Sequence, residues 1–114
     1  MSQYAGSDRV PTVPVDAVGP GTVLLDVREQ DEWDAGHAPD AVHLPATELM
    51  ARYGEVPADT EVHVICRTGG RSARVAAWLN EVGFDAVNVA GGMAAWVEAG
   101  RPIVAAGEDE PRVV

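Results

Sequence analysis

The sequence has one cysteine, no lysine and no apolar run long enough to cross a bilayer. With a single cysteine, no disulfide can form within the chain, which suits a reducing compartment and leaves a free thiol. The first residues also lack the basic start and the apolar stretch of a secretory signal. We therefore expect a cytoplasmic protein with no membrane partner.

Positive charge is scarce: eight basic residues, all arginines, stand against 18 acidic ones, and the formal net charge is -10. A surface this acidic repels polyanions, so the sequence argues against nucleic acid as a partner. The three histidines are scattered, and the spacings typical of metal ligands are missing. We expect neither a metal nor any other cofactor.

Apolar residues make up 46% of the 114 residues, enough for one packed domain that needs no disulfide or metal. Segments with strand-like patterns alternate with helix-like segments, and short connections join them. The expected strands are 22–27, 41–44, 61–65 and 86–89, with no more than a brief edge strand within 11–18, and the expected helices are 29–35, 47–53, 72–82 and 93–99. Thr47 is expected to cap the second of these helices. This alternation predicts an α/β fold with a mostly parallel sheet and helices on both faces.

Cys66 directly follows one of the expected strands and opens a short loop that leads into a helix. In parallel sheets, ligands bind beyond the carboxyl ends of the strands. Gly69 and Gly70 allow the backbone to fold so that several N–H groups converge on one point, as in anion-binding nests. The helix that begins near Arg71 adds the positive end of its dipole, which also favours the thiolate of a nearby cysteine.

Arginines cluster around this loop, at Arg67, Arg71 and Arg74, and no acidic residue lies between residues 62 and 80. Cations next to a thiol lower its pKa and attract anions. The sequence therefore predicts a small, positive, anion-binding bowl with the sulfur of Cys66 at its base.

Such a bowl suits a persulfide, a phosphocysteine intermediate or only a structural turn. Cysteine phosphatases and their arsenate-reducing relatives use a Cys-x5-Arg loop, whereas Cys66 and Arg71 form a tighter Cys-x4-Arg loop that suits sulfur on sulfur better. No general acid for a phosphatase is evident, although Asp26, Asp31 and Asp40 remain candidates. An inert buried cysteine would need neither the glycines nor the arginines.

Four segments, taken together, resemble the rhodanese family in their order and spacing: LLDVREQDEW, GHAPDAVHLP, VICRTGGRS and NVAGGMAAW. The resemblance covers residues 11–104 and implies a rhodanese-like domain with a five-stranded, mostly parallel sheet flanked by helices on both faces. Residues 1–10 and 105–114 are expected to be flexible tails. Ala38 and Asp40 depart from the family's usual Ile and Gly in the second segment.

The resemblance implies a thiosulfate sulfurtransferase, with no cofactor, in which Cys66 is the nucleophile. Cys66 would take a sulfane sulfur from thiosulfate or a similar donor as a persulfide, and cyanide or a thiol would remove it. By the same resemblance, the substrate is bound through amides and charge of the loop residues Arg67, Thr68, Gly69, Gly70 and Arg71.

Two other functions stay open at this point. The domain could act in a sulfur relay, loaded by a partner protein such as a cysteine desulfurase, or it could be a non-catalytic rhodanese-like binding module. The intact cysteine and its loop count against the second, because a module without chemistry needs neither. Asp26 and Arg28, in the first segment, are expected to form a structural ion pair or hydrogen-bond network.

Overall fold

The structure is a computed structural model, and it describes residues 10–114, so most of the expected N-terminal tail at residues 1–10 lies outside the described residues. Its strands are β1 Thr12–Val13, β2 Val23–Asp26, β3 Val42–His43, β4 Glu61–Ile65 and β5 Asp85–Val89. Its α-helices are α1 Gln30–Ala35, α2 Leu49–Arg52, α3 Gly70–Glu81 and α4 Gly92–Glu98. The described residues also contain three short 3-10 helices: η2 Val15–Ala17, η3 Ala46–Glu48 and η4 Tyr53–Glu55.

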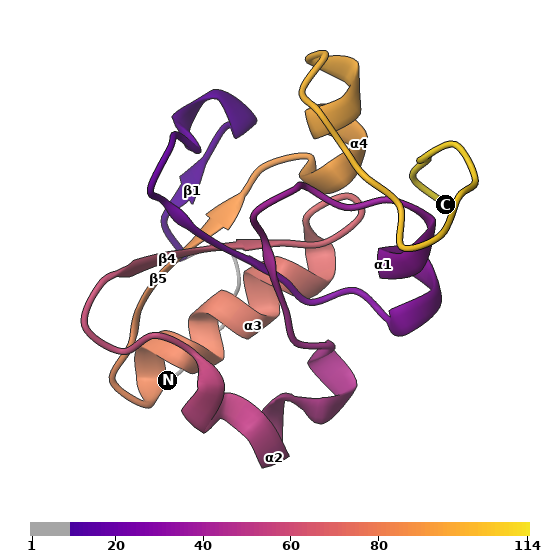
Figure 1. Cartoon of the computed structure of the whole chain (residues 1–114). Coiled ribbons are helices and arrows are strands. Elements are labelled where there is room, and N and C mark those ends of the chain that lie inside the picture. The colour runs from indigo at the N-terminus through magenta and orange to yellow at the C-terminus, as the bar shows by residue number, and fades with distance from the viewer. Residues whose placement is uncertain (1–9) are drawn as a thin grey trace.

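The five strands form one sheet in the order β1-β5-β4-β2-β3, and all four neighbouring pairs are parallel. β4 lies at the centre, and its last four residues are buried, as its apolar run predicts. Helices α2 and α3 lie on one side of the sheet and α4 on the other (Figure 1). The predicted α/β fold is thus confirmed, and all five strands end at the same edge of the sheet.

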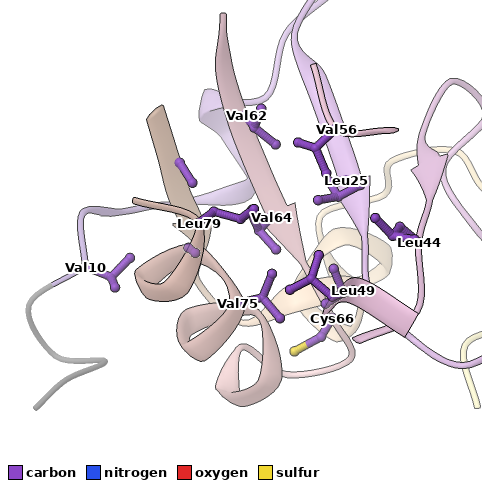
Figure 2. Packing of buried hydrophobic residues seen from close by; sticks show 13 residues of the cluster. Val10, Leu25, Leu44, Leu49, Val56, Val62, Val64, Cys66, Val75 and Leu79 are labelled. Atoms are coloured by element: carbon purple, nitrogen blue, oxygen red, sulfur yellow. The ribbon is translucent and has the colours of Figure 1, made fainter. Parts of the chain in front are cut away.

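Each face of the sheet has its own apolar cluster. The cluster under α2 and α3, drawn in Figure 2, consists of Val10, Leu25, Val27, Leu44, Leu49, Val56, Val62, Val64, Cys66, Val75, Ala76, Leu79 and Ala86. The cluster on the other face consists of Val15, Val18, Leu24, Ala38, Ile65, Val89, Met93 and Trp96. Consecutive residues of β4 divide between the two, since Val64 faces one cluster and Ile65 the other.

The predicted cap at Thr47 is wrong. The expected helix 47–53 is divided into η3, α2 and η4, and α2 follows η3 without a gap, so no open helix end needs a capping side chain. The Thr47 hydroxyl donates instead to the Glu29 carboxylate, with oxygen–oxygen distances of 3.0 and 3.2 Å. This contact ties η3 to the start of α1.

The C-terminal segment lies along α1 (Figure 1). The backbone N–H of Ala106 donates to the Asp34 carbonyl at 3.0 Å, and that of Arg112 donates to the Ala35 carbonyl at 2.9 Å. A Cβ on Gly36 would lie 2.4 Å from the Arg112 carbonyl oxygen, so the two backbones are in close contact there. The flexibility expected for residues 105–114 stays a prediction, but this segment has specific backbone contacts with α1.

Candidate active site

Cys66 directly follows β4 at the edge of the sheet where the strands end, and α3 begins four residues later at Gly70. Cys66 is only 1% exposed and belongs to the cluster beneath α2 and α3. Figure 2 shows its sulfur next to the first turn of α3. The predicted arrangement of strand, loop and helix around the thiol is therefore present.

Two glycine-containing turns give the loop its shape. Gly69, the N-cap of α3, has a φ of 113°, a left-handed conformation that L side chains rarely adopt. Gly92, at the start of α4, packs closely against the loop backbone, because a Cβ there would lie 2.4 Å from the Cys66 carbonyl oxygen. The first amides of α4 bind the same backbone: Met93 N–H donates to the Cys66 carbonyl at 2.8 Å, and Ala94 N–H donates to the Arg67 carbonyl at 3.0 Å.

The sulfur of Cys66 accepts two hydrogen bonds. The Gly69 N–H lies 3.1 Å from Sγ, and the Ser72 hydroxyl lies 3.3 Å from it. The same hydroxyl is 2.6 Å from Oδ1 of Asn88 on β5, so its single hydrogen is shared between two acceptors. Sequence reasoning missed Ser72 and Asn88, although both stand in the quoted segments VICRTGGRS and NVAGGMAAW.

The pKa of the Cys66 thiol lies below its ordinary value. Burial is the largest single influence and raises the pKa, but the polar hydrogens around the sulfur together outweigh it. They belong to its two hydrogen-bond donors, the Ser72 hydroxyl and the Gly69 N–H, and to the nearby backbone N–H groups of Ser72 and Thr68. The site thus favours the thiolate, the reactive form of a cysteine.

Replacing Ser72 by alanine is expected to raise the pKa of Cys66, because a hydrogen bond to the charged form is lost while the burial stays. The rate of Cys66 alkylation, followed from pH 5 to pH 10, should fall at neutral pH and reach the wild-type rate at high pH. Thr60→Ala, which removes a hydroxyl from an exposed position before β4, is the control and should leave the profile unchanged. An unshifted profile in Ser72→Ala would contradict this account.

The Arg71 guanidinium is not a free cation of the loop, because it forms an ion pair with Glu32 of α1. Its guanidinium donates to both carboxylate oxygens, from NH1 at 2.8 Å and from NH2 at 2.9 Å. The hydrogen bond from Arg71 is the largest influence on Glu32 and holds the pKa of this carboxyl at about 2, and in turn the pKa of Arg71 is raised. The predicted positive bowl is therefore wrong in one respect, since sequence reasoning missed the acidic partner of Arg71.

The other arginines near the loop stay accessible. Arg67 and Arg74 are exposed, and neither forms an ion pair with any residue in the range 10–114. Thr68 is exposed as well and lies close enough to the sulfur for its N–H to act on it. Binding of an anion by Arg67, Arg71 and the loop amides stays a prediction.

Two of the three aspartates considered as general acids cannot take that role in a reaction at Cys66. Asp26 is fully buried, and both of its carboxylate oxygens accept hydrogen bonds from Arg28. Asp40 lines a cavity of about 250 Å³ together with Thr22, which precedes β2 and so lies at the opposite edge of the sheet from Cys66. The structural ion pair predicted for Asp26 and Arg28 is confirmed.

The histidines have structural surroundings. His37 and His43 stack on the Trp33 ring, with centroid distances of 3.6 and 4.6 Å, and His63 is buried on β4. No group of three His, Cys, Asp or Glu side chains in the described part of the chain could hold a metal ion. Over the same residues, no helix has the length and apolar character to cross a bilayer.

Three comparisons with known proteins agree on one kind of relative. The family model of the Rhodanese-like domain matches residues 15–99. A protein of Allochromatium vinosum named "Sulfurtransferase" is 40% identical over 84 residues, or 73% of this chain and 78% of that protein. In Bacillus subtilis, "Putative sulfurtransferase YtwF" is 44% identical over 73 residues, or 64% of this chain and 71% of that protein. "Putative sulfur carrier protein YrkF", also from Bacillus subtilis, is 39% identical over 74 residues, or 64% of this chain and 40% of that protein.

Solved structures show the same fold. The crystal structure of a rhodanese-related protein from Thermoplasma volcanium is 35% identical and has a TM-score of 0.70, covering 73% of this chain and 83% of that chain. A rhodanese-like domain protein from Staphylococcus aureus is 29% identical, with a TM-score of 0.72 over 75% of this chain and 90% of that chain.

Proposed function

Because the chain belongs to the rhodanese-like domain family, we propose that Cys66 takes up a sulfane sulfur as a persulfide and passes it to a thiophilic acceptor. The observation that carries this proposal is the environment of the Cys66 sulfur. It lies at the N-terminus of α3 and accepts hydrogen bonds from Gly69 and Ser72, which favour a thiolate at the base of an amide-lined loop.

The proposed transfer moves one sulfur atom without an external oxidant. The Cys66 thiolate attacks the outer sulfur of thiosulfate, a new sulfur–sulfur bond forms, and the old one breaks with its electron pair leaving on sulfite. Cyanide or a thiolate then attacks the outer sulfur of the enzyme persulfide, and the Cys66 thiolate is restored. We assign Arg67 and Arg71 to charge stabilisation, and the amides of Thr68, Gly69 and Gly70 to the outer sulfur.

A sulfur-relay role is the second candidate. It is favoured by the similarity to a Bacillus subtilis protein whose name describes a sulfur carrier. In a relay, a partner protein would load Cys66, and thiosulfate would be a poor donor. A non-catalytic binding module fits less well, because it would not need a thiol with a lowered pKa. Both candidates agree with a cytoplasmic location, which stays a prediction.

The wild-type protein is expected to gain one sulfur atom when incubated with a sulfane donor, and to lose it to cyanide as thiocyanate. Intact-mass spectrometry before and after cyanide, with a colorimetric thiocyanate assay, measures both steps. Protein alkylated at its only cysteine beforehand is the control and should gain nothing. Failure to gain sulfur from thiosulfate and from cysteine persulfide, in protein that still alkylates, would count against the proposed function.

A further inference from the structure

The charge around Cys66 is smaller than the number of arginines suggests. Arg71, the cation at the start of α3, has its guanidinium engaged by both carboxylate oxygens of Glu32. Arg71 lies in the first turn of α3, two residues after Gly69, whose N–H binds the Cys66 sulfur, so the ion pair with Glu32 lies beside the Cys66 loop. Arg71 and Glu32 together contribute no net charge, and Arg67 is the exposed cation of the loop without an ion-pair partner in residues 10–114.

Glu32 is fixed in this position by contacts other than the arginine. It is the third residue of α1 in a capping box, and its Oε1 accepts the backbone N–H of Glu29 at 2.9 Å. Its side chain is only 16% exposed. A carboxylate with a pKa of about 2 keeps its negative charge throughout the neutral range. The charge of Arg71 is therefore cancelled throughout the neutral range, and Arg71 adds no net positive charge for a donor that approaches Cys66.

We propose that Glu32 is a specificity-determining residue, which disfavours dianionic sulfur donors such as thiosulfate and selects persulfides of thiols, R–S–S⁻, that carry one negative charge at the reacting end. This inference rests on the proposed sulfur transfer through Cys66. One unpaired cation, Arg67, matches one negative charge on the donor. Beyond the loop, the net charge of -10 also repels the more highly charged donor.

The two donors differ in charge but not in the bonds that change. In attack on R–S–S⁻, the Cys66 thiolate bonds to the outer sulfur, the donor's sulfur–sulfur bond breaks, and its electron pair leaves on R–S⁻, which then takes a proton from water. Attack on thiosulfate follows the same course, with sulfite leaving. The reaction complex with thiosulfate carries one more negative charge, and no cation matches that charge while Glu32 neutralises Arg71.

The test compares Glu32→Gln with wild type, using thiosulfate and cysteine persulfide as donors and cyanide as acceptor. Glutamine keeps the shape of the side chain and an oxygen that accepts from Arg71, but it removes the charge. We expect kcat/KM for thiosulfate to rise about tenfold and kcat/KM for cysteine persulfide to change less than about threefold. Asp34→Asn, an equal loss of charge at an exposed position of the same helix, is the control and should change neither by more than about twofold.

The outcomes separate the inference from the proposed function. Equal changes with both donors, or a lower kcat/KM for thiosulfate in Glu32→Gln, would overturn the specificity role and leave sulfur transfer intact. A wild-type protein that gains sulfur from neither donor would instead contradict the proposed function. Thermal unfolding of each variant by circular dichroism identifies a change in the fold, and a general loss of fold would lower both rates, not alter their ratio.

Discussion

The Cys66→Ser variant is expected to gain no sulfur from any donor and to release thiocyanate only at the background rate, a loss of at least about 1,000-fold. A serine hydroxyl is not ionised near neutral pH, and it cannot form the sulfur–sulfur bond on which the transfer depends. Intact mass after incubation with thiosulfate or cysteine persulfide, and the thiocyanate assay after cyanide, measure the loss directly.

Cys66→Ser is a suitable test of sulfur transfer because it should remove the reactive thiol and leave the fold intact. The serine oxygen fits the space of the sulfur, and the Gly69 N–H and the Ser72 hydroxyl are both available to it as donors. Unfolding by urea should therefore resemble that of the wild type. Thiocyanate release by the folded variant above background would contradict the mechanism, since Cys66 is the only cysteine in the chain.

The Cys66 loop was predictable because its parts are adjacent in the sequence. The apolar strand, the cysteine, the two glycines and the helical pattern all lie within residues 61–82. In a parallel sheet, a loop that follows a strand reaches the edge where ligands bind. Local order thus sufficed to predict the site of the thiol, the turn and the start of α3.

What sequence reasoning missed comes from contacts between distant segments. Glu32 and Arg71 are 39 residues apart, and Ser72 and Asn88 are 16 residues apart. An inventory of charges near Cys66 along the chain could not include Glu32, because the packing of α1 against the loop brings it there. The charge and the hydrogen bonds at the sulfur are therefore properties of the tertiary structure.

The error at Thr47 has the same origin. A threonine before an apolar helical pattern is a common N-cap, and this local rule predicted its role. In the structure its hydroxyl has a partner 18 residues away, the Glu29 carboxylate, and a 3-10 helix precedes α2. Similarly, the polar composition of residues 105–114 gave no sign of the backbone contacts that this segment makes with α1.

Replacing Asp26 by alanine is expected to destabilise the fold by about 3–5 kcal/mol, the usual cost of leaving one partner of a buried ion pair alone. Asp26 and Arg28 are both 0% exposed, and the carboxylate accepts from Arg28 Nε at 2.9 Å and from NH2 at 2.6 Å. The remaining partners of the guanidinium are the Gly36 and Glu32 carbonyls, which are neutral. Urea unfolding followed by circular dichroism measures the loss of stability.

The double variant Asp26→Leu/Arg28→Met separates the cost of an unpaired charge from the cost of a changed core. It removes both charges and leaves apolar side chains in their place, so it should be more stable than Asp26→Ala. Glu48→Ala, which removes an exposed partner of Arg52, is the surface control and should change the unfolding midpoint little. A double variant no more stable than Asp26→Ala would mean that the pair contributes mainly through its hydrogen bonds to α1 and Gly36. Because these bonds also hold the helix that carries Glu32, the ion pair between Glu32 and Arg71 would then depend on a second, buried ion pair that takes no part in the reaction.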